Sequence, residues 1–408
     1  MILISFLGKG NYQEVIYFLP NDMKEFKTKF FVHALNEFYN PQKTIIFMTD
    51  EAARKYESEM RTFISFDKVK IMEGKNEEEL WNIFETLAES IPTDDEIIID
   101  VTHGFRSIPI VALSVITFLK ILNNIKITKV LYGAFEAKDT YGGKAPIFDI
   151  TNFLDLINWS YAIDEFIHFG NAKRLRNILE LIHNETYKQD SVIKSKSLKS
   201  LGKNLDELTT ALSVIRPNEV FKSAKELPKL IKNVKDDIEK LAKVKPLGKL
   251  LDKIQSEYNL ISEAEGNLFD DKGFKAQAQM INFYIKIEKY QQAITLTREA
   301  LVSYLCIKEK LNPLSKSDRE QSEKMLNEWL DLSRKNIELD EKASLFSKIW
   351  SDLITYRNDI NHAGMRENPI PASTLIANIK EICEKVAHLI QNNLVFSVFL
   401  VVQKFLNA

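Results

Sequence analysis

Residues 97–107 read IIIDVTHGFRS, and a helical pattern that starts near Pro109 follows directly. The run IIIDV is apolar on both faces, as a strand needs to be in a sheet that is covered by helices on each side. The polar, glycine-containing stretch after it marks where the chain leaves the strand. This order of buried strand, loop and helix predicts a parallel sheet built from strand-helix-strand units.

The same pattern recurs through the first 150 residues. Candidate strands are Ile2–Leu7, Thr44–Met48, Val69–Met72, Glu96–Asp100 and Thr128–Gly133. Candidate helices are Asp50–Phe63, Asn76–Ser90 and Pro109–Leu122. Short β-rich runs that alternate with helical periodicity predict a Rossmann-like α/β domain.

From Phe153 onward the pattern is almost uninterrupted helix, with turn signals at 216–218 and 245–248. The chain therefore combines an α/β part with an all-α part. We expect an α/β domain over 1–160, a helical connector over 161–268 and a C-terminal helical domain over 269–408.

Composition indicates an ordinary globular protein, with 408 residues of which 45% are hydrophobic and 27% charged. The formal net charge of -2 offers no global attraction to nucleic acid, so any such binding has to be local. Residues 171–255 contain 19 Lys+Arg against 11 Asp+Glu. This basic connector is either a solvated helical surface or a surface that contacts RNA.

Cysteine usage predicts neither a disulfide framework nor a zinc site, because Cys306 and Cys383 stand alone in helical patterns. We expect a reducing, cytoplasmic environment and no metal. The N-terminal run MILISFLGKGNY is too short for a membrane span and reaches Gly and Lys too soon for a signal peptide. It is predicted to be a buried first strand.

Ligands of open α/β sheets collect beyond the carboxyl ends of the strands. That rule selects two loops, 8–12 (GKGNY) and 102–107 (THGFRS). Backbone N–H groups near Gly104 can cradle an anion, with Arg106 and Ser107 adding side-chain donors. A dinucleotide-binding dehydrogenase is disfavoured, because the first loop lacks the third glycine of a GxGxxG motif.

The C-terminal half contains the hexapeptide RNDINH, from Arg357 to His362, followed by Ala363 and Gly364. Histidine exchanges protons near neutral pH, and arginine presents a planar, charged fork to phosphate oxygens. Asn358 can orient the phosphate or the histidine. These residue types suit metal-independent RNA cleavage, in which the ribose 2′-hydroxyl attacks the adjacent phosphate and leaves 2′,3′-cyclic phosphate ends.

Five residues separate Arg357 from His362 by about 140° on an ideal helix. Either the helix ends between them, or two copies of the chain pool their motifs. The structural alternative is a solvated helix end, in which Arg357 pairs with Asp352 or Asp359 and His362 caps carbonyl groups.

Several segments together resemble the CARF-HEPN ribonucleases of type III CRISPR systems. They are 5–8 (SFLG) with Tyr12, 100–109 (DVTHGFRSIP), 131–137 (LYGAFEA), 148–151 (FDIT) leading to Trp159, and the hexapeptide; residues 290–301 also resemble an early HEPN helix in which a polar pair supports the motif. The resemblance implies a homodimer, or a higher even-numbered oligomer, that is activated by cyclic oligoadenylate and cuts single-stranded RNA. Cyclic tetra-adenylate is the favoured ring size.

Carried over position by position, the resemblance makes Gly8, Lys9, Thr102, His103, Gly104, Arg106 and Ser107 the messenger-binding candidates. Arg357, Asn358 and His362 become the catalytic candidates. His103 has a structural alternative, in which it stabilises the loop. Two other functions stay open: a ligand-responsive transcriptional regulator, and a protein that binds or degrades the messenger and carries an inert helical domain.

Overall fold

The computed structural model describes residues 1–20, 22, 24–92, 95–103, 108–122, 125–188, 193–263, 267–365 and 367–392. The chain divides into two compact units, Met1–Leu156 and Ile157–Ala408. Within the described ranges, no helix is both long and apolar enough to cross a membrane.

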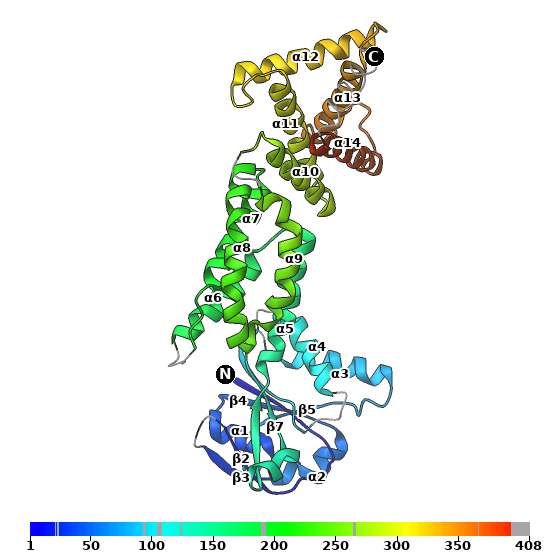
Figure 1. Ribbon diagram of the computed structural model, residues 1–408. Helices are drawn as coiled ribbons and strands as arrows, with labels where there is room; N and C mark the ends of the chain where they lie inside the picture. The colour runs from blue at the N-terminus through cyan, green and yellow to red at the C-terminus, as the bar shows by residue number, and fades with distance from the viewer. Residues whose placement is uncertain are drawn as a thin grey trace. The chain divides into compact units, whose positions relative to one another are not determined.

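A single sheet forms the centre of the first unit (Figure 1). Its described strands are β1 (Ile2–Leu7), β2 (Val15–Phe18), β3 (Glu25–Thr28), β4 (Lys43–Met48), β5 (Asp67–Lys70), β6 (Glu96–Asp100), β7 (Lys126–Gly133) and β8 (Lys144–Asp149). They lie in the order β3-β2-β8-β7-β6-β1-β4-β5. Strands β7, β6, β1, β4 and β5 run parallel, whereas β8 is antiparallel to β7 and β3 is antiparallel to β2.

Helices cover both faces of this sheet, as the apolar strands require. They are α1 (Phe31–Tyr39), α2 (Asp50–Met60), α3 (Glu77–Ser90) and α4 (Ile108–Leu122), and a 3-10 helix η1 (Phe135–Tyr141) follows β7. Alternate residues of β1 serve the two faces: Leu3 and Leu7 share a buried cluster with α1 and α2. Ile4 and Phe6 share a second buried cluster with α3 and α4.

Helices make up the second unit. They are α5 (Thr151–Phe169), which begins in the first unit, α6 (Lys173–Lys188), α7 (Leu198–Ser213), α8 (Pro217–Lys240), η2 (Ala242–Val244), α9 (Lys245–Ser262), α10 (Asp271–Lys286), α11 (Tyr290–Lys308), α12 (Lys316–Arg334), α13 (Glu341–Asn361) and α14 (Ala372–Asn392). Consecutive helices from α6 to α9 pack on one another, and α14 packs on α10, α11 and α13. One buried cluster runs from Trp159 to Ile390. The predicted fold class, a Rossmann-like domain followed by helices, is confirmed.

Five described elements of the first unit have no counterpart in the sequence prediction: β2, β3, β8, α1 and η1. Strands β2 and β3 have four residues each, and β3 alternates charged and apolar residues at the edge of the sheet. Such short edge strands give a weak sequence signal. Strand β5 spans Asp67–Lys70 rather than Val69–Met72, so that prediction was shifted by two residues.

Candidate functional site

A cavity of about 250 Å³ lies where β1, β6 and β7 end. Its lining comes from the loop after β1, from β2, from the segment before α1, from the loop after β6 and from the β7-η1 junction. The lining residues are Asn11, Tyr12, Gln13, Tyr17, Lys29, Thr102, His103, Tyr132, Gly133, Phe135 and Glu136. This is the carboxyl edge of the parallel strands, where the fold predicts a ligand.

A buried carboxylate fixes the loop that follows β6. Asp100 is fully buried and accepts hydrogen bonds from the Ser5 hydroxyl at 2.6 Å and from the backbone N–H of Thr102 at 2.7 Å. Burial raises the pKa of Asp100 to about 6, although both hydrogen bonds oppose the shift. The Thr102 hydroxyl in turn accepts a hydrogen bond of 2.9 Å from the N–H of Gly133. The ends of β1, β6 and β7 are therefore tied together beneath the cavity.

His103 joins three parts of the cavity wall. Its backbone oxygen accepts a hydrogen bond of 2.8 Å from Gly8, and its ring centroid lies 4.3 Å from that of Tyr12. Its Nε2 atom accepts a hydrogen bond from the N–H of Phe31 at 3.3 Å. Burial lowers the pKa of His103 to about 4, so the ring is neutral at physiological pH. His103 has the loop-stabilising contacts of the structural alternative and also lines the cavity.

The rest of the cavity wall mixes aromatic rings with hydrogen-bonding groups. Tyr12, Tyr17, Tyr132 and Phe135 supply rings, while Asn11, Gln13, Lys29 and Glu136 supply amide, ammonium and carboxylate groups. The hydroxyl of Tyr132 donates a hydrogen bond to Glu136. A wall of this kind suits a ligand that carries flat rings, amino groups and negative charge.

The second candidate lies at the end of α13. The helix ends at Asn361, and His362 occupies the C-cap with its side chain exposed. Ala363 and Gly364 then adopt left-handed backbone conformations, with φ of 54° and 66°. The N–H of Gly364 returns to the backbone oxygen of Asp359 at 2.9 Å. The helix therefore ends only one residue before His362, whose N–H still bonds to the backbone oxygen of Asn358 at 2.9 Å, so Arg357 and His362 still leave α13 on different sides.

Arg357 has an unusual environment for an arginine. Its Nε atom is buried and lacks a hydrogen-bond partner among the described residues. The structure shows no ion pair from Arg357 to Asp352 or to Asp359, so the paired helix end of the structural alternative is not formed. A partly buried guanidinium without a carboxylate partner retains its capacity to bind an external anion.

The polar pair of α11, Arg298 and Glu299, is well partnered. Arg298 contacts Glu299 at 2.6 Å and Glu323 of α12 at 2.8 Å, and its guanidinium lies 5.2 Å from the ring of Trp350. Trp350 is seven residues, or about two turns, before Arg357 on the same face of α13. Arg298 therefore helps to fix the helix that carries Arg357.

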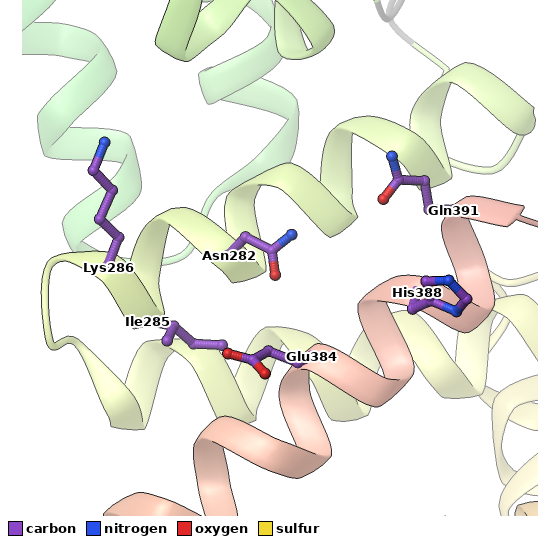
Figure 2. A pocket seen from close by; sticks show the side chains of 6 residues that line it. All are labelled: Asn282, Ile285, Lys286, Glu384, His388 and Gln391. Atoms are coloured by element: carbon purple, nitrogen blue, oxygen red, sulfur yellow. The ribbon is translucent and has the colours of Figure 1, made fainter.

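A separate groove of about 500 Å³ lies between α10 and α14. Figure 2 shows Asn282, Ile285 and Lys286 on one side and Glu384, His388 and Gln391 on the other. Neither Arg357 nor His362 belongs to it. Over the described residues, no group of three or more His, Cys, Asp or Glu side chains is arranged to hold a metal ion.

Comparison with known proteins identifies the first unit and the helices that follow it. Residues 2–136 match the model of the CARF domain of the CRISPR system endoribonuclease Csx1. Residues 155–262 match the second domain of the CRISPR-associated protein MJ1674. The chain is a CRISPR-associated CARF protein. The curated protein MJ1674 of Methanocaldococcus jannaschii is 21% identical over 380 residues, which cover 89% of this chain and 54% of that protein. The chain thus spans about half the length of this relative.

In this CARF protein the predicted messenger-binding residues fall into three groups. Thr102 and His103 line the cavity, and buried Gly8 contacts it through His103. Lys9 is exposed, does not line the cavity and pairs with Glu51 at 3.0 Å. Gly104, Arg106 and Ser107 lie outside the described residues.

Some cavity residues of the CARF domain were missed as site candidates. Tyr17 and Lys29 lie in or beside the short strands β2 and β3, which the pattern does not predict. Tyr132 and Glu136 lie within the segment 131–137 that supported the family resemblance. Extending the carboxyl-edge rule to the end of β7 is the signal that finds them.

Proposed function

We propose that this CARF protein is a ribonuclease that cyclic oligoadenylate activates and that cuts single-stranded RNA with its C-terminal helical region. The observation that carries the proposal is the Arg357 guanidinium, which makes no ion pair with any described residue and lies five residues before an exposed histidine at a helix end. The membership of the N-terminal unit in the Csx1 type of CARF domain supports a nuclease. The HEPN domain is proposed to span residues 269–408, after a connector over 161–268.

The cavity at the carboxyl edge is the proposed messenger site. Adenine rings can stack on the tyrosine and phenylalanine side chains, and the amino group of adenine can donate a hydrogen bond to Glu136. If Glu136 faced the phosphates of the messenger rather than adenine, its negative charge would repel them. Thr102, His103 and Gly8 hold the frame of this site. Lys9, Gly104, Arg106 and Ser107 are proposed to contact the messenger as well.

The proposed chemistry needs a proton acceptor, a proton donor and stabilisation of negative charge. His362 is proposed to exchange protons with the attacking 2′-hydroxyl or the leaving 5′-oxygen. Arg357 is proposed to stabilise the charge that develops on the pentacoordinate phosphate, and exposed Asn358 to orient the phosphate. Because the ribose hydroxyl is the nucleophile, this route needs no metal ion, and its products end in 2′,3′-cyclic phosphate.

Two copies of the chain are proposed to form the active site. The Cα of a C-cap residue still lies on the helical path, so Arg357 and His362 leave α13 about 140° apart. Two antiparallel or crossing motifs can place the arginine of one copy beside the histidine of the other. A two-fold symmetric messenger, with cyclic tetra-adenylate favoured, can then select the dimer arrangement that assembles the site.

Fluorescent single-stranded RNA tests the proposal in the presence of a chelator, with cyclic tetra-adenylate, cyclic hexa-adenylate or no addition. We expect cleavage only with one cyclic messenger, loss of cleavage in His362→Ala, and normal cleavage in His388→Ala. His388 is a matched control, since it is an exposed histidine of α14 outside the motif. Tight messenger binding without RNA cleavage would overturn the nuclease in favour of a regulator or a messenger-degrading protein.

A further inference from the structure

The hairpin formed by α8 and α9 carries lysines that the rest of the helical unit does not neutralise. Nine exposed lysines of these two helices make no ion pair with any described residue: Lys222, Lys225, Lys229, Lys232, Lys235, Lys240, Lys245, Lys249 and Lys253. We call them the hairpin lysines. The two helices pack on each other and are joined by the short helix η2.

In the neighbouring helices of the same unit, several basic residues form ion pairs. Arg176 of α6 contacts Asp206 of α7 at 2.7 Å, and Lys199 contacts Glu180 at 3.3 Å. Lys243, which lies between α8 and α9, contacts Glu185 at 3.0 Å. Several basic side chains of α6 and α7 therefore have carboxylate partners, whereas the nine hairpin lysines have none among the described residues.

The acidic residues of the hairpin do not cancel this excess. Asp237 is buried and accepts hydrogen bonds from the backbone N–H groups of Lys196 and Ser197, and Glu257 pairs with Lys286 of α10. Five acidic residues remain on the hairpin without such a partner, namely Glu219, Glu226, Asp236, Glu239 and Asp252. With Glu257 neutralised by Lys286, nine lysines against these five carboxylates and buried Asp237 leave a local charge of +3 on a protein whose formal net charge is -2.

The lysines of α8 are also ordered along the helix. Lys222, Lys225, Lys229 and Lys232 follow one another at spacings of three, four and three residues, which places them on one face. This face is opposite the one that buries Leu227 and Ile231. The backbone positions of the four lysines span about 15 Å along the helix axis, at 1.5 Å per residue.

We propose that the outer face of the α8-α9 hairpin binds the phosphate backbone of single-stranded RNA. A linear row of unpaired ammonium groups matches a linear row of phosphates, and the attraction requires no particular base sequence. The choice of RNA rests on the proposed function, whereas the binding itself needs neither messenger nor cleavage. The hairpin would hold a strand on the protein before and during its cleavage elsewhere.

The test uses the full-length protein without messenger and a fluorescent 20-nucleotide 2′-O-methyl RNA, which the proposed chemistry cannot cut. The hairpin variant carries Lys222→Gln, Lys225→Gln, Lys229→Gln and Lys232→Gln. A matched control carries Lys199→Gln, Lys203→Gln, Lys316→Gln and Lys324→Gln, which removes the same charge from exposed lysines that have carboxylate partners. A third variant has arginine at the four hairpin positions.

At about 0.1 M salt we expect the hairpin variant to bind the RNA at least tenfold more weakly, with the control within twofold of wild type and the arginine variant unchanged. The slope of log affinity against log salt should become shallower by about 2 to 3, since each phosphate contact on a single strand contributes about 0.7. Equal losses in hairpin variant and control, or no loss in either, would overturn the proposal.

Two further measurements distinguish RNA binding by the hairpin from membrane binding and from the proposed nuclease activity. Loss of binding to vesicles of phosphatidylcholine and phosphatidylserine (3:1), with RNA binding unchanged, would assign the hairpin to a membrane surface and overturn the proposal. Messenger-dependent cleavage of unmodified RNA reports on the proposed nuclease independently. Its absence together with hairpin-dependent RNA binding would overturn the nuclease alone.

Discussion

The backbone N–H of Phe31, at the start of α1, donates a hydrogen bond to Nε2 of His103, in the loop after β6, at 3.3 Å. The acceptor nitrogen must carry a lone pair, so this contact requires the neutral form of the imidazole. The low pKa of His103, about 4, has burial as its cause and agrees with the hydrogen bond. Protonation of this one ring would therefore break the contact between α1 and the cavity wall.

The first prediction concerns acid stability. Between pH 6.5 and pH 4 the unfolded chain protonates His103 while the folded chain does not, so this residue's contribution to stability is present above pH 6.5 and is lost as the pH falls toward 4. We subtract the free energy of unfolding of His103→Gln from that of wild type at each pH. This difference should decrease by at most about 3 kcal/mol as the pH falls from 6.5 to 4. Denaturant titrations monitored by circular dichroism at each pH measure the difference.

Asp100 makes the comparison with His103→Gln necessary. Its pKa is raised to about 6 by burial, so the folded chain takes up this proton first and gains stability as the pH falls below 6. The two contributions oppose each other in wild type, but Asp100 is present in both proteins and cancels in the difference. A difference that does not change with pH would show that His103 is not held neutral.

A second prediction tests whether Glu136 of the cavity binds the adenine of the messenger. If Glu136 accepts a hydrogen bond from the adenine amino group, Glu136→Gln should weaken binding of cyclic tetra-adenylate about tenfold, as loss of a charge-assisted hydrogen bond implies. Calorimetry measures the affinity, and Asp139→Asn, an exposed carboxylate of the same 3-10 helix, is the control. Tighter binding by Glu136→Gln would instead place the carboxylate beside the phosphates.

How much of this architecture the sequence predicts depends on burial. The strands IIIDV and TIIFM are apolar on both faces, which identified the central parallel sheet and its covering helices. Strand β3 exposes charged residues at a sheet edge, and helix α1 has only nine residues. Short or half-exposed elements are specified by their tertiary contacts, such as Gly133, where an added Cβ would lie 2.6 Å from the Phe31 ring.

The candidate sites show the same division. Local sequence placed Thr102 and His103 at the carboxyl edge, because a strand end and a loop are local features. Local sequence did not predict Lys29 or Tyr17 as cavity residues. Their approach to the cavity depends on the pairing of β2 with β8, and these strands are about 130 residues apart in sequence, roughly the length of a whole domain. Among the described residues no ion pair joins Arg357 to Asp352 or Asp359, although both lie close to it in sequence, and this too depends on the tertiary structure.

A third prediction concerns the turn that carries His362. Asp359 is buried, its carboxylate accepts a hydrogen bond from the N–H of Ile370, and its backbone oxygen accepts one from Gly364. Asp359→Ala leaves the N–H of Ile370 without this acceptor and loosens the turn. We expect a tenfold or greater loss in kcat for RNA cleavage, with KM within about threefold, because His362 is misplaced while the RNA still binds.

Two variants separate positioning by Asp359 from a general loss of stability. Asp359→Asn keeps an oxygen acceptor and should restore most of kcat. Asp352→Ala removes a half-buried carboxylate from the same helix and should leave kcat near the wild-type value. If all three variants lose kcat in proportion to their loss in Tm, Asp359 has no specific role in positioning.

The last prediction is that replacing Arg357 increases the stability of the protein but abolishes its activity. A buried Nε–H without a hydrogen-bond partner costs about 1 to 3 kcal/mol, so Arg357→Met should raise the free energy of unfolding by about 1 kcal/mol while it abolishes RNA cleavage. Arg357→Lys keeps the charge but loses the planar fork, and should lower kcat about 100-fold. Arg334→Met, which changes an exposed arginine of α12, should alter neither quantity. A less stable Arg357→Met with normal cleavage would mean that Arg357 is a structural residue, and that the phosphate is held by another cation.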